Sequence, residues 1–174
     1  SMSRSGTQRD LARELLQEQG IVRLSEFKAV GITAATISRM LKDGEVARLA
    51  RGLYQLPDVP IDANHSLAEA AKRVPKGVVC LVSALAFHGL TDQLPRAVWM
   101  AIGTKDWAPK AGTPPIQIVR FTEALLTDDV ITERIEGVSV KIFGVAKTVA
   151  DCFRHRRTVG QSVALEGLQE ALRQ

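Results

Sequence analysis

The sequence predicts an α+β protein, with a winged helix-turn-helix over residues 7–57 and a mixed α/β domain with a central sheet over residues 62–174. Leucines at helical spacing and a glycine-centred hairpin predict the first segment, and apolar runs of strand length between helical patterns predict the second. The boundary is expected at Leu56–Asp62, because Pro57 and Pro60 suit neither a helix interior nor a central strand.

The composition is that of an ordinary soluble globular protein. Hydrophobic residues make up 45% of the 174 residues and charged residues 24%. No run reaches the roughly 18–20 apolar residues that a membrane span needs, and the N-terminus lacks the pattern of a secretory leader. Ser1-Met2 resembles a remnant of expression and is left out of the fold prediction. We therefore expect a cytoplasmic protein without a membrane partner.

The positive charge is concentrated in the smaller, first segment. The formal net charge of the chain is +4. Residues 1–57 contain nine Lys and Arg against six Asp and Glu, whereas the rest of the chain contains fourteen against thirteen. This distribution is compatible with a nucleic-acid partner of the first segment.

Two cysteines, Cys80 and Cys152, lie in apolar surroundings. There is no Cys-x-x-Cys pair and no His/Cys cluster, so we expect neither a metal site nor another cofactor. Two reduced thiols in the core are the preferred interpretation, with a disulfide as the alternative.

Helix start and stop signals divide the first segment into three short helices and a hairpin. Thr7 with Asp10 and Thr33 are expected N-caps, and glycines are expected to end the helices. Ile37 and Leu41 are expected to face the core from the third helix. Ser25 is the expected cap of the second helix, and the glycines expected to end the three helices are Gly20, Gly31 and Gly44. Two strands are expected at 46–49 and 53–56, joined by the turn Ala50-Arg51-Gly52.

The third helix is the candidate DNA-reading element. Its outward side chains would face base edges in a major groove, with Thr36 and Arg39 as base contacts and Arg39 also able to neutralise a phosphate. Arg51 at the wing tip is placed to reach a minor groove. The alternatives are a solvated basic face or a protein-binding module. The candidate DNA-binding residues are Ala35, Thr36, Ser38, Arg39, Lys42, Arg48 and Arg51.

The second segment reads as helices around a central sheet. Ser66 and Glu69 form a capping-box pattern that predicts a helix ending before Pro75, and Ser83 is the expected cap of another helix. Glu136-Gly137 marks a hairpin. Strands are expected at 78–82, 97–102, 116–121, 131–135 and 138–143, and final helices at 146–156 and 162–172.

Several of these stretches together resemble the AbiEi family of antitoxins over about residues 8–172. They are Ser83 to Pro95, Val98-Trp99, Ile116 to Phe121, Glu136 to Val140, Ala146 to Phe153, and the Arg51-Gly-Leu-Tyr54 end of the first segment. The resemblance implies a transcriptional regulator of type IV toxin-antitoxin or abortive-infection systems. It further implies that the winged helix represses its own operon by binding promoter repeats and that the second domain counteracts a nucleotidyltransferase-like toxin.

The second domain type also resembles the core of restriction-type nucleases, which makes a metal-dependent nuclease the alternative function. Such a site needs an acidic residue and a Glu-x-Lys on neighbouring strands. Glu136 and Lys141 are five positions apart, which in a strand means opposite faces, and Lys105-Asp106 has no Glu-x-Lys beside it. We therefore expect a nuclease-like core without the catalytic motif, and no enzyme.

Other pairs favour structural roles. Ser83 and His88 are i, i+5 on one short helix, which does not align a nucleophile with a base, and Asp151 and His155 have the i, i+4 spacing of an ordinary side-chain pair. The basic run 154–157 is either a solvated helix end or a docking or phosphate surface. The candidate partner or phosphate contacts are Trp107, Arg154, Arg156 and Arg157.

Overall fold

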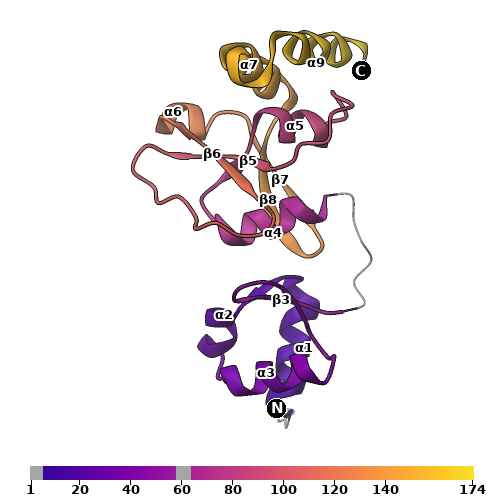
Figure 1. Ribbon diagram of the computed structural model, residues 1–174, viewed down its shortest axis with the longest axis vertical. Helices are drawn as coiled ribbons and strands as arrows, with labels where there is room; N and C mark the ends of the chain where they lie inside the picture. The colour runs from indigo at the N-terminus through magenta and orange to yellow at the C-terminus, as the bar shows by residue number, and fades with distance from the viewer. Residues whose placement is uncertain (1–5, 58–63) are drawn as a thin grey trace, which may run out of the picture.

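A computed structural model describes residues 6–57 and 64–174, so most of the expected linker and the expected start of the second domain at residue 62 lie outside the described residues. The described residues form a mixed α+β structure with two separate sheets, which confirms the predicted class. We call residues 6–57 the N-terminal unit and residues 64–174 the C-terminal unit (Figure 1). No helix in these two ranges is long and apolar enough to cross a membrane.

The N-terminal unit places three helices beside a small antiparallel sheet of order β1-β3-β2. Its elements are α1 (Gln8–Gln19), β1 (Val22–Arg23), α2 (Leu24–Ala29), α3 (Ala34–Lys42), β2 (Ala47–Ala50) and β3 (Leu53–Gln55).

Two of the three predicted N-caps are present. The Thr7 hydroxyl accepts the Asp10 backbone N–H while the Asp10 carboxylate accepts that of Thr7, and the Thr33 hydroxyl accepts the Thr36 N–H. The prediction of Ser25 as a cap was wrong, because α2 begins at Leu24 and its N-cap is Arg23, two residues before Ser25. The Glu26 carboxylate accepts the Arg23 backbone N–H at 3.1 Å and so satisfies a donor at this helix start.

The core of the N-terminal unit is built on α1, α2 and α3. Phe27, Ile37 and Met40 are at most 1% exposed. The expectation that Leu41 faces the core was wrong: Leu41 is 36% exposed, and Met40 takes the inward position. The inward face of α3 therefore uses the i, i+3 spacing from Ile37 rather than i, i+4, and both spacings put side chains on one face.

The C-terminal unit is a five-stranded mixed sheet of order β6-β5-β4-β8-β7 with helices on both faces. β5 pairs in parallel with β6, and β4 in parallel with β8, while the remaining pairs are antiparallel. Its elements are α4 (His65–Arg73), β4 (Val78–Val79), α5 (Leu81–Phe87), β5 (Val98–Gly103), β6 (Ile116–Phe121), α6 (Glu123–Leu126), β7 (Val130–Ile135), β8 (Val138–Phe143), α7 (Val145–Arg154), α8 (Arg156–Val159) and α9 (Gln161–Arg173).

Both serine caps predicted in the C-terminal unit were wrong. Helix α4 begins at His65, after Asn64, and Glu69 contacts the His65 ring instead of the helix end. The strand expected at 78–82 stops after Val79, since the chain turns at Leu81 (φ 48°) into α5. Ser83 therefore lies inside α5, where its hydroxyl accepts the Trp99 N–H at 2.9 Å.

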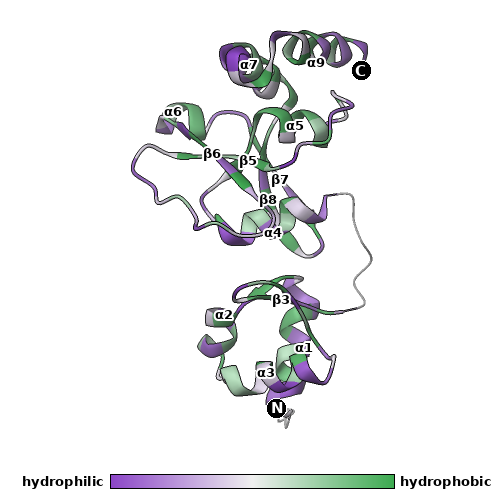
Figure 2. Cartoon of the chain, viewed as in Figure 1, coloured by the Kyte–Doolittle hydropathy of each residue, from purple (hydrophilic) through white to green (hydrophobic). Residues whose placement is uncertain are grey.

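Helix α4 covers one face of the larger sheet, and α5 the other, with α7 packed against α5 and α9 against α7. Helix α5 is largely hydrophobic (Figure 2), because most of its side chains are buried between the sheet and α7. In Figure 1, α4 lies between the sheet and the N-terminal unit. Ile21 and Leu53 of the N-terminal unit belong to the same buried cluster as Leu67 of α4 and Ile135 of β7. The two units are thus joined by a continuous apolar core.

Polar contacts also join the two units. The Lys72 ammonium on α4 is 2.8 Å from the Glu26 carboxylate on α2. The Arg134 guanidinium on β7 donates to the Glu18 carbonyl oxygen at 2.9 Å. These contacts orient the small sheet of the N-terminal unit toward the C-terminal unit.

Candidate nucleic-acid interface

The outward side of α3 presents a short basic face. The side chains of Ala35, Ser38, Arg39 and Lys42 are exposed, as the sequence predicts. The two cations lie in the last turn, and no acidic residue lies in the first. Within residues 6–57 and 64–174, neither cation forms an ion pair. This face therefore offers uncompensated positive charge next to small side chains.

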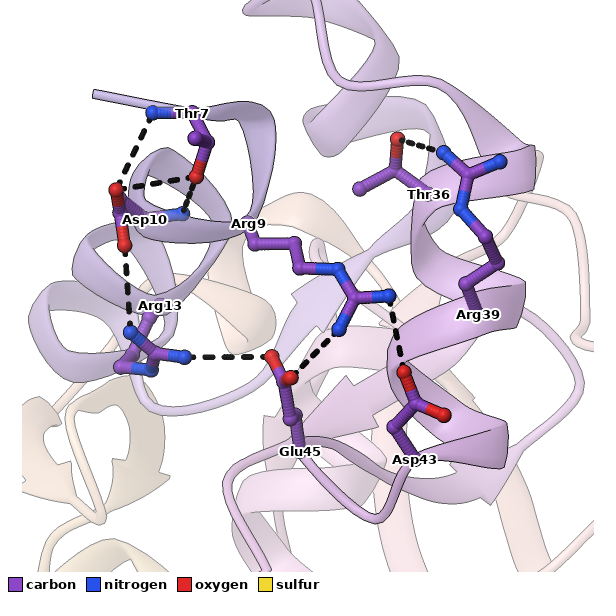
Figure 3. A network of polar contacts seen from close by, with 8 residues as sticks. All are labelled: Thr7, Arg9, Asp10, Arg13, Thr36, Arg39, Asp43 and Glu45. Atoms are coloured by element: carbon purple, nitrogen blue, oxygen red, sulfur yellow. Dashed lines mark hydrogen bonds and ion pairs between the residues drawn. The ribbon is translucent and has the colours of Figure 1, made fainter. Parts of the chain in front are cut away.

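Thr36 departs from its predicted position. The sequence placed it on the outward side of α3, but Thr36 is 3% exposed, so that expectation was wrong. Its hydroxyl donates to the Gln8 side-chain oxygen at 2.6 Å. The same hydroxyl accepts a hydrogen bond from an Arg39 nitrogen 3.3 Å away (Figure 3). Thr36 thus ties α3 to α1, and its hydroxyl also contacts the Arg39 guanidinium.

A network of ion pairs fixes the C-terminal end of α3 against α1. The Arg9 guanidinium lies 2.9 Å from Asp43 and 2.6 Å from Glu45, and Arg13 lies 3.3 Å from Glu45 (Figure 3). The hydrogen bonds that Arg9 donates to the carboxylates of Asp43 and then Glu45 raise the pKa of Arg9 above its ordinary value. The acidic side chains that follow α3 are therefore engaged with α1 and do not face Arg39.

The hairpin cations lie apart from the α3 face. In Figure 1, α3 is at the end of the N-terminal unit far from α4, whereas β3 is at the end near α4. Arg48 and Arg51 are exposed, and Arg48 Nε donates to the Ala50 carbonyl oxygen at 3.4 Å. Arg51, which the sequence predicted at the wing tip, lies beside Arg73 and Lys110 of the C-terminal unit.

Arg51 instead lines a hollow of about 380 Å³ between the two units. The hollow's charged lining side chains are all basic: Arg23, Arg51, Arg73 and Lys110. Sequence reasoning missed this group because its members come from four segments of the chain. The only hint of this basic group in the sequence is the net positive charge of the chain.

The candidate partner contacts are scattered over the C-terminal unit. Trp107, one of these candidates, is 94% exposed. Arg154 lies 3.9 Å from Asp151, and Arg156 donates to the Phe153 carbonyl oxygen at 3.1 Å. Arg157 is exposed on α8. Since Trp107 follows β5 while the three arginines flank the α7–α8 junction, they do not come from one segment.

The residues that the sequence offered as possible catalytic pairs form contacts with other groups instead. Glu136 contacts the His65 ring, and the Lys141 ammonium donates to the Lys76 carbonyl oxygen at 3.4 Å. His88 Nε2 lies 2.8 Å from the Phe143 carbonyl oxygen. No three His, Cys, Asp or Glu side chains gather in a metal-binding arrangement within the described ranges.

Asp151 pairs with Lys147 rather than with His155, which corrects the expected i, i+4 pair. The Lys147 ammonium lies 2.7 Å from the Asp151 carboxylate, and both side chains are almost fully buried. The ammonium also lies over the rings of Phe121 and Phe143, at 4.9 and 4.7 Å from their centroids. His155 stacks on Phe121 with ring centroids 5.6 Å apart. We find no sequence signal that distinguishes this lysine from an exposed one.

In a comparison with protein families, residues 9–57 match the model described as "Transcriptional regulator, AbiEi antitoxin". This range contains α1, α2, α3 and the hairpin, and it includes every candidate DNA-binding residue. No curated protein matches the chain. The match supports an antitoxin and DNA-binding regulator as the class of protein. Residues 9–57 are thus similar to the AbiEi antitoxin transcriptional regulators, which agrees with the sequence resemblance in this part of the chain.

Proposed function

We propose that this chain is a DNA-binding transcriptional autorepressor and the antitoxin of a type IV toxin-antitoxin system, counteracting a nucleotidyltransferase-like toxin. The observation that carries the proposal is the exposed, uncompensated basic face of α3 within the family-matched segment. In this proposal the N-terminal unit acts as a winged helix-turn-helix, with α3 as the helix that enters the major groove.

The side chains on α3 divide into two roles. Ala35 and Ser38 are small, so the helix backbone approaches the base edges closely. Arg39 is long enough to make a bidentate contact with guanine, and Lys42 neutralises a backbone phosphate. Thr36 acts indirectly, because its hydroxyl is engaged with Gln8 and Arg39.

The hairpin supplies further phosphate contacts. Arg48 and Arg51 are exposed cations on or beside the turn between β2 and β3. Strand β3 of the hairpin lies nearer to the C-terminal unit than α3 does (Figure 1), so a duplex that contacts both elements must extend along the molecule. The excess of positive charge in residues 1–57 supports an electrostatic contribution to this binding.

The C-terminal unit carries the antitoxin activity in this proposal, through a functional or physical relation to the toxin in the cytoplasm. Trp107 and the arginines at 154, 156 and 157 are the surface side chains that we assign to partner or phosphate contact. A 94% exposed tryptophan is unusual on a solvent-facing surface and suits a protein interface.

The test separates the two activities in one cell. A reporter driven by the chain's own promoter measures repression, and growth upon expression of the neighbouring nucleotidyltransferase-like gene measures antitoxin activity. The proposal expects Arg39→Ala to lose repression and to keep growth rescue. The matched control is Arg96→Ala, an exposed arginine in the loop before β5, which should change neither. Full repression by Arg39→Ala, or no rescue by the unaltered chain, would contradict the proposal.

A further inference from the structure

We propose that the hollow between the β2–β3 turn and the 104–115 loop is a phosphate-binding site that spans the two units. The proposal rests on the proposed function only for one of its two ligand sources, the DNA backbone. The hollow measures about 380 Å³, which accommodates a phosphate or diphosphate group with its water. The basic face of α3 is a separate surface, because α3 lies at the end of the N-terminal unit that is far from the C-terminal unit (Figure 1).

The charge of the hollow is one-sided. Arg23, Arg51, Arg73 and Lys110 line it, and no Asp or Glu is among its lining residues. None of these four side chains forms an ion pair within the described parts of the chain. Four cations around one small space repel one another, and a multiply charged anion relieves that repulsion. The hollow is therefore expected to attract anions.

One of the cations is held in place by the loop it faces. Arg73, at the end of α4, donates to the carbonyl oxygens of Pro114 and Lys110 at 2.5 and 2.9 Å. A Cβ on Gly112 would lie 2.9 Å from an Arg73 nitrogen, so the guanidinium packs closely against the backbone at residue 112. Arg73 thus shapes the 110–114 segment while keeping its charge at the edge of the hollow.

The opposite wall is also fixed. The Gly52 carbonyl oxygen accepts the Leu24 N–H at 2.9 Å, which ties the hairpin turn to the start of α2 beside Arg23. Gly52 has φ +76° and leaves open space around its α-carbon. The turn therefore presents a small backbone surface between Arg51 and the loop, and long arginine and lysine side chains are free to close on a ligand.

Phosphate is the anion that this donor set suits best. Arginine offers a planar fork of donors that matches phosphate oxygens, and lysine adds a point charge. Arg23 and Arg51 belong to the N-terminal unit, and Arg73 and Lys110 to the C-terminal unit, so a bound phosphate is gripped from both. The consequence is that phosphate binding stabilises the docked arrangement of the units.

The phosphate comes from one of two sources, the backbone of a duplex or a phosphorylated small molecule. Pyrophosphate, measured by calorimetry on the full chain, is the probe for the second source. We expect Lys110→Ala and Arg51→Ala each to weaken its binding roughly tenfold, the loss of about one charged hydrogen bond. Arg96→Ala, which removes the same charge elsewhere, should bind it as the unaltered chain does. Arg73 is left unchanged, because its loss would also release the loop.

The duplex arm uses promoter DNA at several salt concentrations. If a backbone phosphate fills the hollow, Lys110→Ala lowers the slope of log K against log salt by roughly one relative to Arg96→Ala. A change in either arm supports the site and identifies its source. Pyrophosphate binding that depends on Lys110 in a chain that binds no DNA would keep the site and reject the proposed function. The site would be overturned if Lys110→Ala and Arg51→Ala bound pyrophosphate as Arg96→Ala does and Lys110→Ala also showed the salt slope of Arg96→Ala.

Discussion

Gly20 and Glu136 are in direct backbone contact where the two units meet. Gly20 ends α1 with φ +80°, and a Cβ placed on it would overlap the Glu136 carbonyl oxygen. Glu136 lies in the β7–β8 turn, where its carboxylate contacts His65 at the start of α4. The glycine therefore satisfies two demands at once, a left-handed backbone and a close approach between segments more than a hundred residues apart in the sequence.

Gly20→Ala should lower the free energy of unfolding by more than about 2 kcal/mol, because strain and steric overlap add. Gly31→Ala is the matched control, since Gly31 has φ +88° and no atom within 4 Å of its Cβ position. Urea denaturation of the two variants isolates the contact with Glu136. Equal destabilisation by the two alanines would show that this contact does not limit stability.

Lys147→Met should destabilise the chain by about 3–5 kcal/mol, because it removes the 2.7 Å partner of the buried Asp151 carboxylate and leaves only the exposed Arg154 at 3.9 Å. One oxygen of this carboxylate has no hydrogen-bond partner even in the intact chain. The double variant Lys147→Met/Asp151→Leu should recover most of the loss in urea denaturation. Lys141→Met, whose ammonium meets only a carbonyl, serves as control. No recovery in the double variant would contradict a role confined to charge pairing.

Stability should fall at alkaline pH because of the buried thiols. Burial, and then the charge of Asp151, raise the pKa of Cys152 to about 12 from an ordinary 9.0. The folded chain therefore keeps this proton between pH 9 and 12, where the unfolded chain loses it. The contribution is complete below pH 9 and is lost as the pH rises toward 12, by at most about 1.4 kcal/mol per pH unit.

Urea denaturation from pH 7.5 to 10.5 checks this dependence. Cys152→Ala should be less stable at pH 7.5, since it leaves a cavity, but its stability should decline less steeply above pH 9. Cys80, whose pKa burial also raises, remains in both proteins, so part of the decline persists in the variant. Parallel curves for the two proteins would contradict this assignment.

Thr36→Val should lower the free energy of unfolding by about 1 kcal/mol, since it removes the 2.6 Å hydrogen bond from the buried Thr36 hydroxyl to the Gln8 side-chain oxygen, which still accepts the Thr33 N–H. Its affinity for promoter DNA should fall much less than that of Arg39→Ala, because Thr36 does not reach the surface of α3. Parallel measurements of thermal unfolding and duplex binding check both effects. An affinity loss as large as that of Arg39→Ala would restore Thr36 as a direct base contact.

Sequence reasoning recovered the elements whose signals are local. The Thr7 and Thr33 caps and strand β6 are where the sequence placed them. Strong capping residues and apolar runs bounded by glycine or proline determine such features within a few positions. Helix α5 was shortened in the prediction, because the apolar run 78–82 has no local signal for the turn at Leu81.

The candidate site was predictable only in part. The exposed face of α3 follows from periodicity, but the i, i+3 choice of Met40 over Leu41, and the burial of Thr36, depend on how α1 packs. The hollow beside Arg51 was not predictable, since it depends on the docking of α4 and the 104–115 loop against the hairpin. Long-range packing, rather than local preference, determines both.

The most direct test of the central claim is the salt dependence of promoter binding for Arg39→Ala and Lys42→Ala beside Arg96→Ala. Each α3 variant removes one uncompensated cation, so we expect weaker binding and a slope of log K against log salt that is shallower by roughly one. Arg39→Ala should also discriminate less among operator sequences. Unchanged affinity, slope and sequence preference in both variants would contradict DNA reading by α3.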